Sequence, residues 1–207
     1  MGLKILHSAD WHLGTAYGQL SDRQRETLVR AQKALPGQIA DICRREGCQL
    51  ALLSGDLLDG PVSREWVELL KEALADFQVP VMIAPGNHDY CCPGSPWLEE
   101  VWPENVHVFT GMMESVTFPA LGCRVYGSGF QSMDCDALLD DFQAEGEERY
   151  CVAVLHGDPL RGDSPYNPVT KAQIRESGLD YLALGHVHKQ GQLLAGETGS
   201  CYQPGPP

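Results

Sequence analysis

Five short apolar runs recur along the chain, and each ends in a polar or glycine-containing turn. They lie at residues 3–7, 49–54, 79–85, 150–156 and 180–186. Short, nearly continuous apolar runs bounded by turn residues are typical of strands that are buried on both faces of a sheet. The pattern therefore predicts five buried strands.

Apolar residues at helical spacing separate the first three runs. One predicted helix begins at Ser21, a candidate N-cap with Gln24 three residues further on. Its apolar positions are Leu28, Ala31, Leu35, Ile39 and Ile42. A second predicted helix covers about 63–77, with Val67, Leu70, Leu74 and Phe77 on one face. Strand and helix thus alternate, which predicts an α/β fold whose sheet begins with parallel strands.

The middle and the end of the chain are less regular. The pieces "VHVF", "SVTF" and "CRVYG", between residues 106 and 127, predict antiparallel additions to the sheet or a second sheet. The stretch 136–148, "DALLDDFQAEGEE", predicts a helix with a solvated acidic end, and "YQPGPP" at 202–207 predicts a loop. A chain of 207 residues without internal repeats is expected to form a single domain over 1–207.

The charge balance limits how the protein can hold a substrate. The chain has 15 Lys and Arg against 28 Asp and Glu, a net charge of −13. Surfaces that hold nucleic acid by neutralising its phosphates are usually basic. If the substrate is a phosphate ester, a positive charge other than Lys or Arg is therefore expected to attract it.

The remaining composition predicts a cytoplasmic protein with free thiols. No run approaches the ~18 consecutive apolar residues of a membrane span, and the first residues lack the apolar centre of a signal peptide. The eight cysteines never occur as C-x-x-C, which argues against a zinc ribbon, and without an export signal we expect no disulfides.

Side chains that can bind a metal are concentrated at the predicted strand ends. These are Asp10, His12, Asp56, Asn87, His88, Asp89, His156, His186 and His188. Together with His7, which ends the first apolar run, six of the seven histidines lie in these strand-end segments, and only His107 lies outside them. Ligand crevices in open α/β sheets lie at the carboxyl ends of the strands, so we expect these side chains to meet. Carboxylates, imidazoles and one amide without a thiolate suit Mn²⁺, Fe or Zn²⁺ in an open catalytic site.

Each motif alone has a structural interpretation. An Asn-His-Asp turn can serve only local hydrogen bonds, and a Gly-Asp pair can cap a helix. Five motifs at equivalent positions of one sheet architecture favour a shared site over five independent turns.

The order of the motifs resembles a known superfamily. D-x-H, G-D, G-N-H-D, H and G-H-x-H follow one another from Asp10 to His188, as in the calcineurin-like metallophosphoesterases. The stretches "ILHSADWHLGT", "GDSPYNPVT", "DYLALGHVHK" and "GSCYQPGPP" resemble the SbcD-like DNA repair exonuclease branch. The resemblance implies a four-layer α-β-β-α sandwich with a two-metal site at the carboxyl ends of the strands.

The resemblance also implies a ligand set for two divalent ions. One ion would be held by Asp10, His12, Asp56 and His188. The other would be held by Asp56, Asn87, His156 and His186, with Asp56 as the bridge. Manganese is the expected metal, with iron or zinc as alternatives. Two such ions outweigh the charge of Asp10 and Asp56, so they would attract phosphate and generate a metal-bridging hydroxide that attacks it.

Catalytic roles follow for the residues beside these ligands. His88 is expected to act as the general acid that protonates the leaving oxygen, and Asp89 is expected to orient its imidazole. Tyr166 and Asn167, in the loop after His156, are weaker candidates for substrate contact, with an ordinary turn as the alternative.

The expected function is that of a metal-dependent phosphodiesterase, with DNA as substrate and exonuclease activity as the leading hypothesis. Relatives continue into a capping region and into helices that bind an SbcC-like ATPase partner, and we expect neither region within 1–207. Two alternatives remain: a phosphomonoesterase or small cyclic-nucleotide phosphodiesterase, and a noncatalytic metal-binding scaffold. A general acid at His88 argues against the scaffold.

Overall fold

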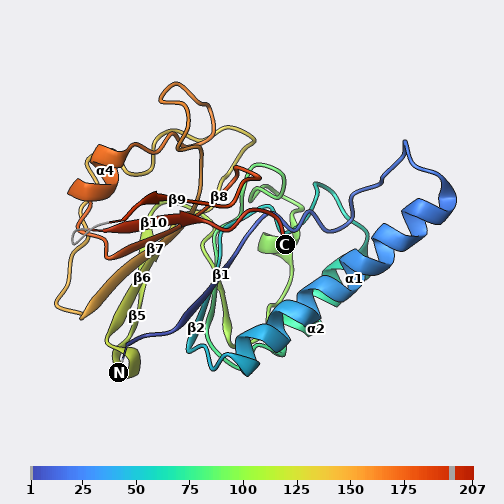
Figure 1. The fold of residues 1–207 in the computed structure, drawn as a ribbon, viewed down its shortest axis with the longest axis horizontal. Helices are drawn as coiled ribbons and strands as arrows, with labels where there is room; N and C mark the ends of the chain where they lie inside the picture. Colours follow the sequence, from blue (N-terminus) through green and yellow to red (C-terminus); the bar gives the residue numbers. More distant parts are fainter. Residues whose placement is uncertain (1, 196–198) are drawn as a thin grey trace.

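Two β-sheets pack face to face, with helices on their outer sides (Figure 1). The structure is a computed structural model, and it describes residues 2–195 and 199–207. The first sheet has the order β1-β2-β3-β4 and is parallel throughout. Its strands are Ile5–Ser8 (β1), Leu50–Leu53 (β2), Val81–Ile83 (β3) and Val106–Val108 (β4). Helices α1 (Asp22–Arg45) and α2 (Arg64–Ala75) connect its first three strands.

The second sheet has the order β5-β6-β7-β8-β10-β9. Its strands are Glu114–Phe118 (β5), Cys123–Gly127 (β6), Tyr150–His156 (β7), Tyr181–Gly185 (β8), Gly191–Leu194 (β9) and Ser200–Gln203 (β10). β5 and β9 are antiparallel to their neighbours, and the other pairs are parallel. The short elements are α3 (Pro96–Glu99), a 3-10 helix (Pro119–Leu121) and α4 (Lys171–Glu176).

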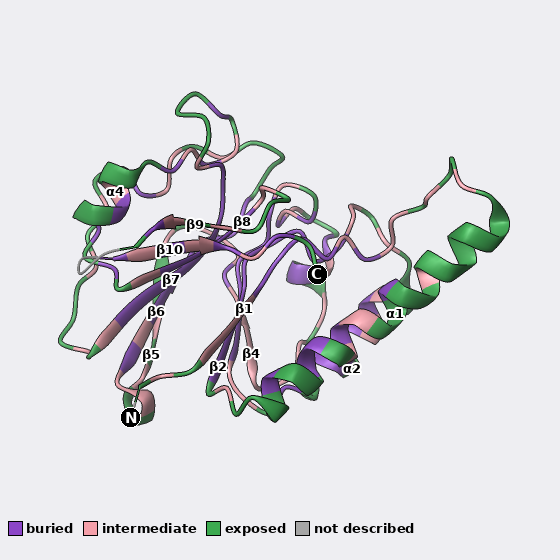
Figure 2. Cartoon of the chain, in the orientation of Figure 1, coloured by how far each residue is buried: buried purple, intermediate pink, exposed green. Residues whose placement is uncertain are grey.

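Three apolar layers hold these elements together. Leu53 and Leu70 belong to the layer between the first sheet and α1 and α2. Leu52 packs in the layer between the two sheets, and Ile174 of α4 packs on the outer face of the second sheet. The central strands β2, β7 and β8 are almost continuously buried, whereas the edge strands β5 and β9 are partly exposed (Figure 2). The α/β class and the α-β-β-α layering are therefore confirmed.

The two predicted long helices are present, and Ser21 is the N-cap of α1 as predicted. The backbone N–H of Ser21 donates to Oε1 of Gln24 at 3.2 Å, and Ser63 occupies the N-cap position of α2 without a side-chain hydrogen bond to the helix. The apolar stripe of α1 is only partly buried, because Leu28 is 37% exposed and Ile42 is 41% exposed. The N-terminal half of α1 extends beyond the sheet into solvent, which explains the exposure of Leu28 (Figures 1 and 2).

Three predictions of secondary structure were wrong. "VHVF" adds a fourth parallel strand to the first sheet, whereas "SVTF" and "CRVYG" form the predicted antiparallel pair. Residues 136–148 contain turns and no helix, because their backbone bonds to distant partners: Leu138 N–H donates to Asn167, and Ala144 N–H donates to Ser177. The C-terminal segment expected as a loop begins inside β10, which pairs with β8.

Two expectations from composition can be compared with the structure. All eight cysteines are free thiols, as predicted. Within residues 2–195 and 199–207, no helix is both long enough and apolar enough to cross a bilayer.

His7 of β1 links the two sheets below the strand ends. Its Nδ1 shares a hydrogen bond of 2.9 Å with the hydroxyl of Tyr181 in β8, and its Nε2 shares one of 2.8 Å with Oγ of Ser54. Burial lowers the pKa of His7 to about 3. The imidazole is therefore neutral in the folded protein at any pH near neutrality.

This histidine is expected to make stability depend on pH. The unfolded chain takes up the proton near pH 6.5, whereas the folded chain resists it down to about 3, so folding stability falls as the pH drops below 6.5. Between pH 7 and 4.5 the free energy of unfolding of the wild type should fall by about 1–2 kcal/mol more than that of the His7→Gln variant. This range allows for the partial exposure of His7. Urea unfolding of both proteins in EDTA measures the difference. Equal losses would contradict this assignment.

Candidate metal centre

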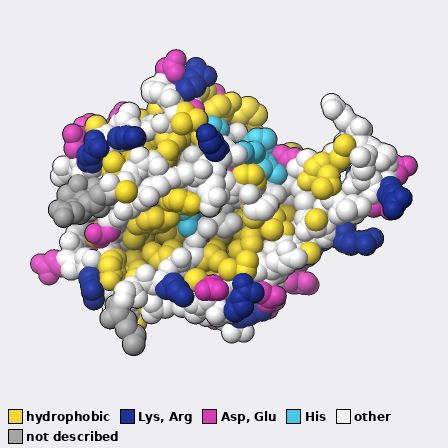
Figure 3. Space-filling view, viewed as in Figure 1, with side chains coloured by type: hydrophobic (Ala, Val, Ile, Leu, Met, Phe, Trp, Pro, Cys, Tyr) yellow, Lys and Arg dark blue, Asp and Glu magenta, His cyan; other side chains and the backbone are white. Residues whose placement is uncertain are grey.

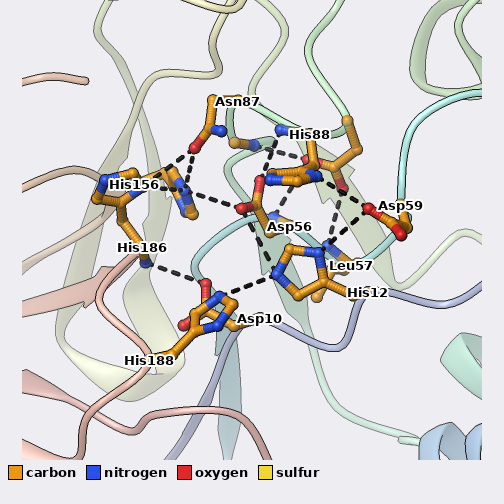
Figure 4. A network of polar contacts seen from close by, with 12 residues as sticks. Asp10, His12, Asp56, Leu57, Asp59, Asn87, His88, His156, His186 and His188 are labelled. Atoms are coloured by element: carbon orange, nitrogen blue, oxygen red, sulfur yellow. Dashed lines mark hydrogen bonds and ion pairs between the residues drawn. The ribbon is translucent and has the colours of Figure 1, made fainter. Parts of the chain in front are cut away.

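Five strand ends from both sheets meet at one rim of the sandwich. The residues after β1, β2, β3 and β8, together with the last residue of β7, bring carboxylates and imidazoles together there (Figure 4). On the surface, histidine side chains gather next to an acidic side chain at this rim (Figure 3). The convergence expected from the positions of the motifs is therefore present in the fold.

One group consists of Asp10, His12 and His188, whose ligand atoms lie within 4.8 Å of one another. The two Nε2 atoms of His12 and His188 are 3.0 Å apart. Asp10 is 2% exposed, and its Oδ1 accepts the backbone N–H of His186. Its Oδ2 is buried without a hydrogen-bond partner among the described residues. An ionised oxygen left in this way is costly unless a cation occupies the space beside it.

A second group consists of Asp56, His156 and His186, again within 4.8 Å. Asn87 lies beside it, because its Oδ1 is 3.0 Å from Nε2 of His156 and 3.1 Å from Nδ1 of His186. Nδ1 of His156 donates to the carbonyl of Ser54 at 2.9 Å. That bond turns Nε2 of His156 toward the group, as an outer hydrogen bond commonly orients a ligating imidazole.

Asp56 lies between the two groups. Its Oδ2 is 3.3 Å from Nε2 of His156 and 3.8 Å from Nε2 of His12. Its Oδ1 accepts the backbone N–H of His88 at 2.9 Å. A short carboxylate in this position can serve a pair of ions ~3.5–4 Å apart.

The backbone at the rim adopts conformations that side chains rarely tolerate. Asp10, His12, Asp56 and His186 all have positive φ, between 45° and 99°. Such conformations cost about 1–3 kcal/mol each and persist where the surrounding structure imposes them, often at functional sites. Gly86 is required for a close approach, since a Cβ there would lie 2.8 Å from the imidazole of His156.

The protonation states suit metal ligands. Burial lowers the pKa of His12, and burial together with His156 lowers the pKa of His186 to about 4, so both imidazoles offer lone pairs at neutral pH. Burial disfavours charge on His156, but the carboxylates of Asp56 and Asp10 raise its pKa to about 9. A cation entering this group would displace that proton. The donor set therefore fits divalent metal ions.

The predicted partner of His88 is corrected by the structure. Nδ1 of His88 donates to Oδ1 of Asp59 at 2.9 Å, and the ring is 46% exposed, with His12 packed edge-on against it. Asp89 does not orient the imidazole. The side chain of Asp89 is 6% exposed and turns into the protein.

Asp89 instead joins two turns that carry ligands. Its carboxylate accepts the backbone N–H groups of Gly86, Asp56, Leu57 and Leu58 at 2.7–3.2 Å. Burial and the nearby charge of Asp56 raise the pKa of Asp89 to about 6. Its place is therefore behind the site, where it fixes the backbone that positions Asp56 and Asn87.

The two weaker candidates for substrate contact, Tyr166 and Asn167, lie in different environments. Tyr166 is partly exposed, and its ring lies 5.0 Å from that of His186, so it borders the metal groups. Asn167 is fully buried. Its amide donates to the carbonyl of His156 and accepts the N–H of Leu138, so it supports the loop and cannot contact a substrate.

Asp59 is a functional candidate that the motif pattern missed. It accepts hydrogen bonds from His88 and, at 2.7 Å, from the hydroxyl of Thr15. Burial opposes its charge, but these bonds and the neighbouring His12 lower the pKa of Asp59. The available signal was the second acid in "GDLLDG", three residues after Asp56.

Comparisons with known proteins agree with this geometry. The sequence profile of the calcineurin-like phosphoesterase family matches residues 3–190. The chain is 31% identical, over 98% of its length, to the uncharacterized metallophosphoesterase YhaO of Bacillus subtilis strain 168, of which it covers 52%. In structure, TT1561 of Thermus thermophilus resembles it with a TM-score of 0.61 at 12% identity, over 100% of this chain and 90% of that one, which supports the fold.

Two similar proteins are named as nuclease or DNA repair proteins. The D component of nuclease SbcCD from Staphylococcus epidermidis is 33% identical over 47% of this chain and 26% of its own. The DNA double-strand break repair protein Mre11 of Saccharolobus solfataricus is 24% identical over 92% of this chain and 51% of its own. The chain thus spans about half or less of these curated relatives. By the match over nearly all of its length, the protein belongs to the calcineurin-like phosphoesterase family, whose members use divalent metal ions.

Proposed function

We propose that the protein is a phosphodiesterase that hydrolyses DNA, with Mn²⁺ as its metal. The observation that carries the proposal is the pair of ligand groups joined at Asp56, with the partly exposed His88 beside them. The names of the SbcCD and Mre11 relatives support DNA as the substrate. An SbcC-like ATPase partner stays a prediction of the same resemblance.

The residues divide the work in the following way. Asp10, His12, Asp56 and His188 would hold one cation, and Asp56, Asn87, His156 and His186 would hold the other. When bound, the cations supply charge stabilisation to the phosphate and lower the pKa of bound water. His88 donates a proton to the leaving oxygen, and Asp59 holds its imidazole through Nδ1, so that Nε2 is free for that transfer.

A substrate panel tests the proposal. The purified protein with Mn²⁺ is assayed on bis-p-nitrophenyl phosphate, p-nitrophenyl phosphate and end-labelled single-stranded and duplex DNA. We expect cleavage of the diester and of DNA, and loss of both activities in EDTA. Activity on the monoester alone would replace the proposal with a phosphomonoesterase.

Asp59 is expected to act through His88. Asp59→Ala should lower kcat on DNA about 10–100-fold with a small change in KM, because the imidazole loses the bond that orients it. In a His88→Ala background the same substitution should have little further effect, since residues that act as a unit are not additive. Steady-state kinetics of the wild type, the two single variants and the double variant measures this double-mutant cycle. Additive losses would show that Asp59 acts independently of His88.

A further inference from the structure

A small apolar pocket opens beside the candidate general acid. It has a volume of about 210 Å³ and lies between the turn at 60–61 and the loop 90–97. Its walls include His88, Tyr90, Pro61, Pro93, Pro96 and Trp97. His88 is therefore shared between the metal centre and this pocket.

The size of the pocket fits part of a ligand. Sites that enclose whole small molecules are commonly about 300–1,000 Å³, so 210 Å³ accommodates about one ring system. Its described lining residues include no Lys or Arg, and the carboxylate of Asp89 is occupied by backbone N–H groups. An uncharged planar group suits such walls, whereas a phosphate does not.

The pocket wall is fixed before a ligand arrives. Trp97 is 3% exposed and stacks on Trp102 with ring centroids 4.8 Å apart. The loop is tied down by hydrogen bonds from Cys91 N–H to Phe130 and from Ser95 N–H to Cys92, at 2.7 and 2.8 Å. A preorganised pocket loses little conformational entropy when it binds.

We propose that this pocket binds the base of the leaving nucleoside, an inference that rests on the proposed phosphodiesterase function. In hydrolysis, water oxygen bonds to phosphorus and loses a proton to solvent, the bond from phosphorus to the leaving oxygen breaks, and the proton from His88 goes to that oxygen. His88 then regains a proton from solvent. The leaving nucleoside therefore departs on the His88 side, where Tyr90 and the prolines offer a surface for its ring. The pocket then selects for a base on the product that carries no phosphate.

Dinucleotides that lack one base test this directly. The metal-loaded protein is given thymidine dinucleotide and two analogues in which one or the other residue is abasic, and product analysis identifies the side that leaves without phosphate. Losing the base on the leaving side should lower kcat/KM roughly tenfold or more, since stacking of one base is worth that much. A base effect confined to the side that retains the phosphate would overturn the proposal.

Filling the pocket should abolish this selectivity. In Cys92→Phe and Pro93→Trp the ratio of kcat/KM for the dinucleotide over the abasic analogue should fall toward 1, whereas a damaged fold lowers both rates and keeps the ratio. Val101→Phe, at an 85% exposed position outside the pocket, should keep the wild-type ratio. An unchanged ratio in both filled variants would overturn the proposal.

A binding measurement separates the two proposals. If the protein cleaves no diester at all, the proposed phosphodiesterase function fails. The pocket is then tested by saturation-transfer NMR with thymidine as the probe. Saturation that is strong in the wild type and lost in Cys92→Phe supports the base site, and equal saturation in both proteins overturns it.

Discussion

Replacing His88 with alanine is expected to lower kcat on DNA by about 10²–10⁴-fold. The DNA leaving group is an alkoxide that needs a proton, so loss of the general acid should lower the rate of DNA cleavage by the whole of this factor. The loss on bis-p-nitrophenyl phosphate should be much smaller, because p-nitrophenolate leaves without protonation. Steady-state rates on the two substrates measure this difference. His107→Ala, at a histidine outside the centre, is the matched control.

Metal content decides between two roles for His88. Its ring also lies in a group with His12 and Asp56 whose ligand atoms are within 4.8 Å, so it is placed where a ligand could be. If His88 is the general acid, the His88→Ala protein should retain both metal ions. If His88→Ala loses an ion, or loses equal activity on both substrates, the assignment as general acid is wrong.

Asp56→Asn is expected to remove both metal binding and activity. Asp56 is 2% exposed, and its Oδ2 faces His156 and His12, one from each ligand group. The amide has the same size but no charge, so metal binding should weaken at both positions. Since metal ions supply several kcal/mol of charge stabilisation, activity should fall by about three orders of magnitude or more.

Elemental analysis after dialysis, with rates on both substrates, measures this effect. Asp134→Asn, at an exposed acid far from the ligand groups in the sequence, controls for loss of one charge. An Asp56→Asn protein that retains two ions and most of its activity would show that Asp56 does not bridge them.

The strand-end logic explains why most of the centre could be predicted from the sequence. The strand ends at His7–Ser8 and at Leu53–Ser54 are visible where apolar runs give way to polar residues, and parallel strands bring such ends to one edge. Ser21 and Gln24 likewise indicate the start of a helix, because their capping hydrogen bond joins residues three apart in the sequence. These features depend on neighbours in the sequence or on a simple periodicity.

What the sequence could not supply depends on contacts between distant segments. The choice of Asp59 over Asp89 as partner of His88 follows from the direction of each side chain in a folded turn. Asn167 looked available for a substrate, but the fold buries it between His156 and Leu138. The 136–148 stretch has helical spacing, yet hydrogen bonds to the loop and to the end of α4 replace the helix.

The account rests on two cations held together at the rim of the sandwich. Anomalous diffraction at the manganese edge, from crystals grown with Mn²⁺, tests this most directly. It should show two peaks ~3.5–4 Å apart, one among Asp10, His12 and His188 and the other among Asp56, His156 and His186. A single peak, or peaks away from these side chains, would contradict it.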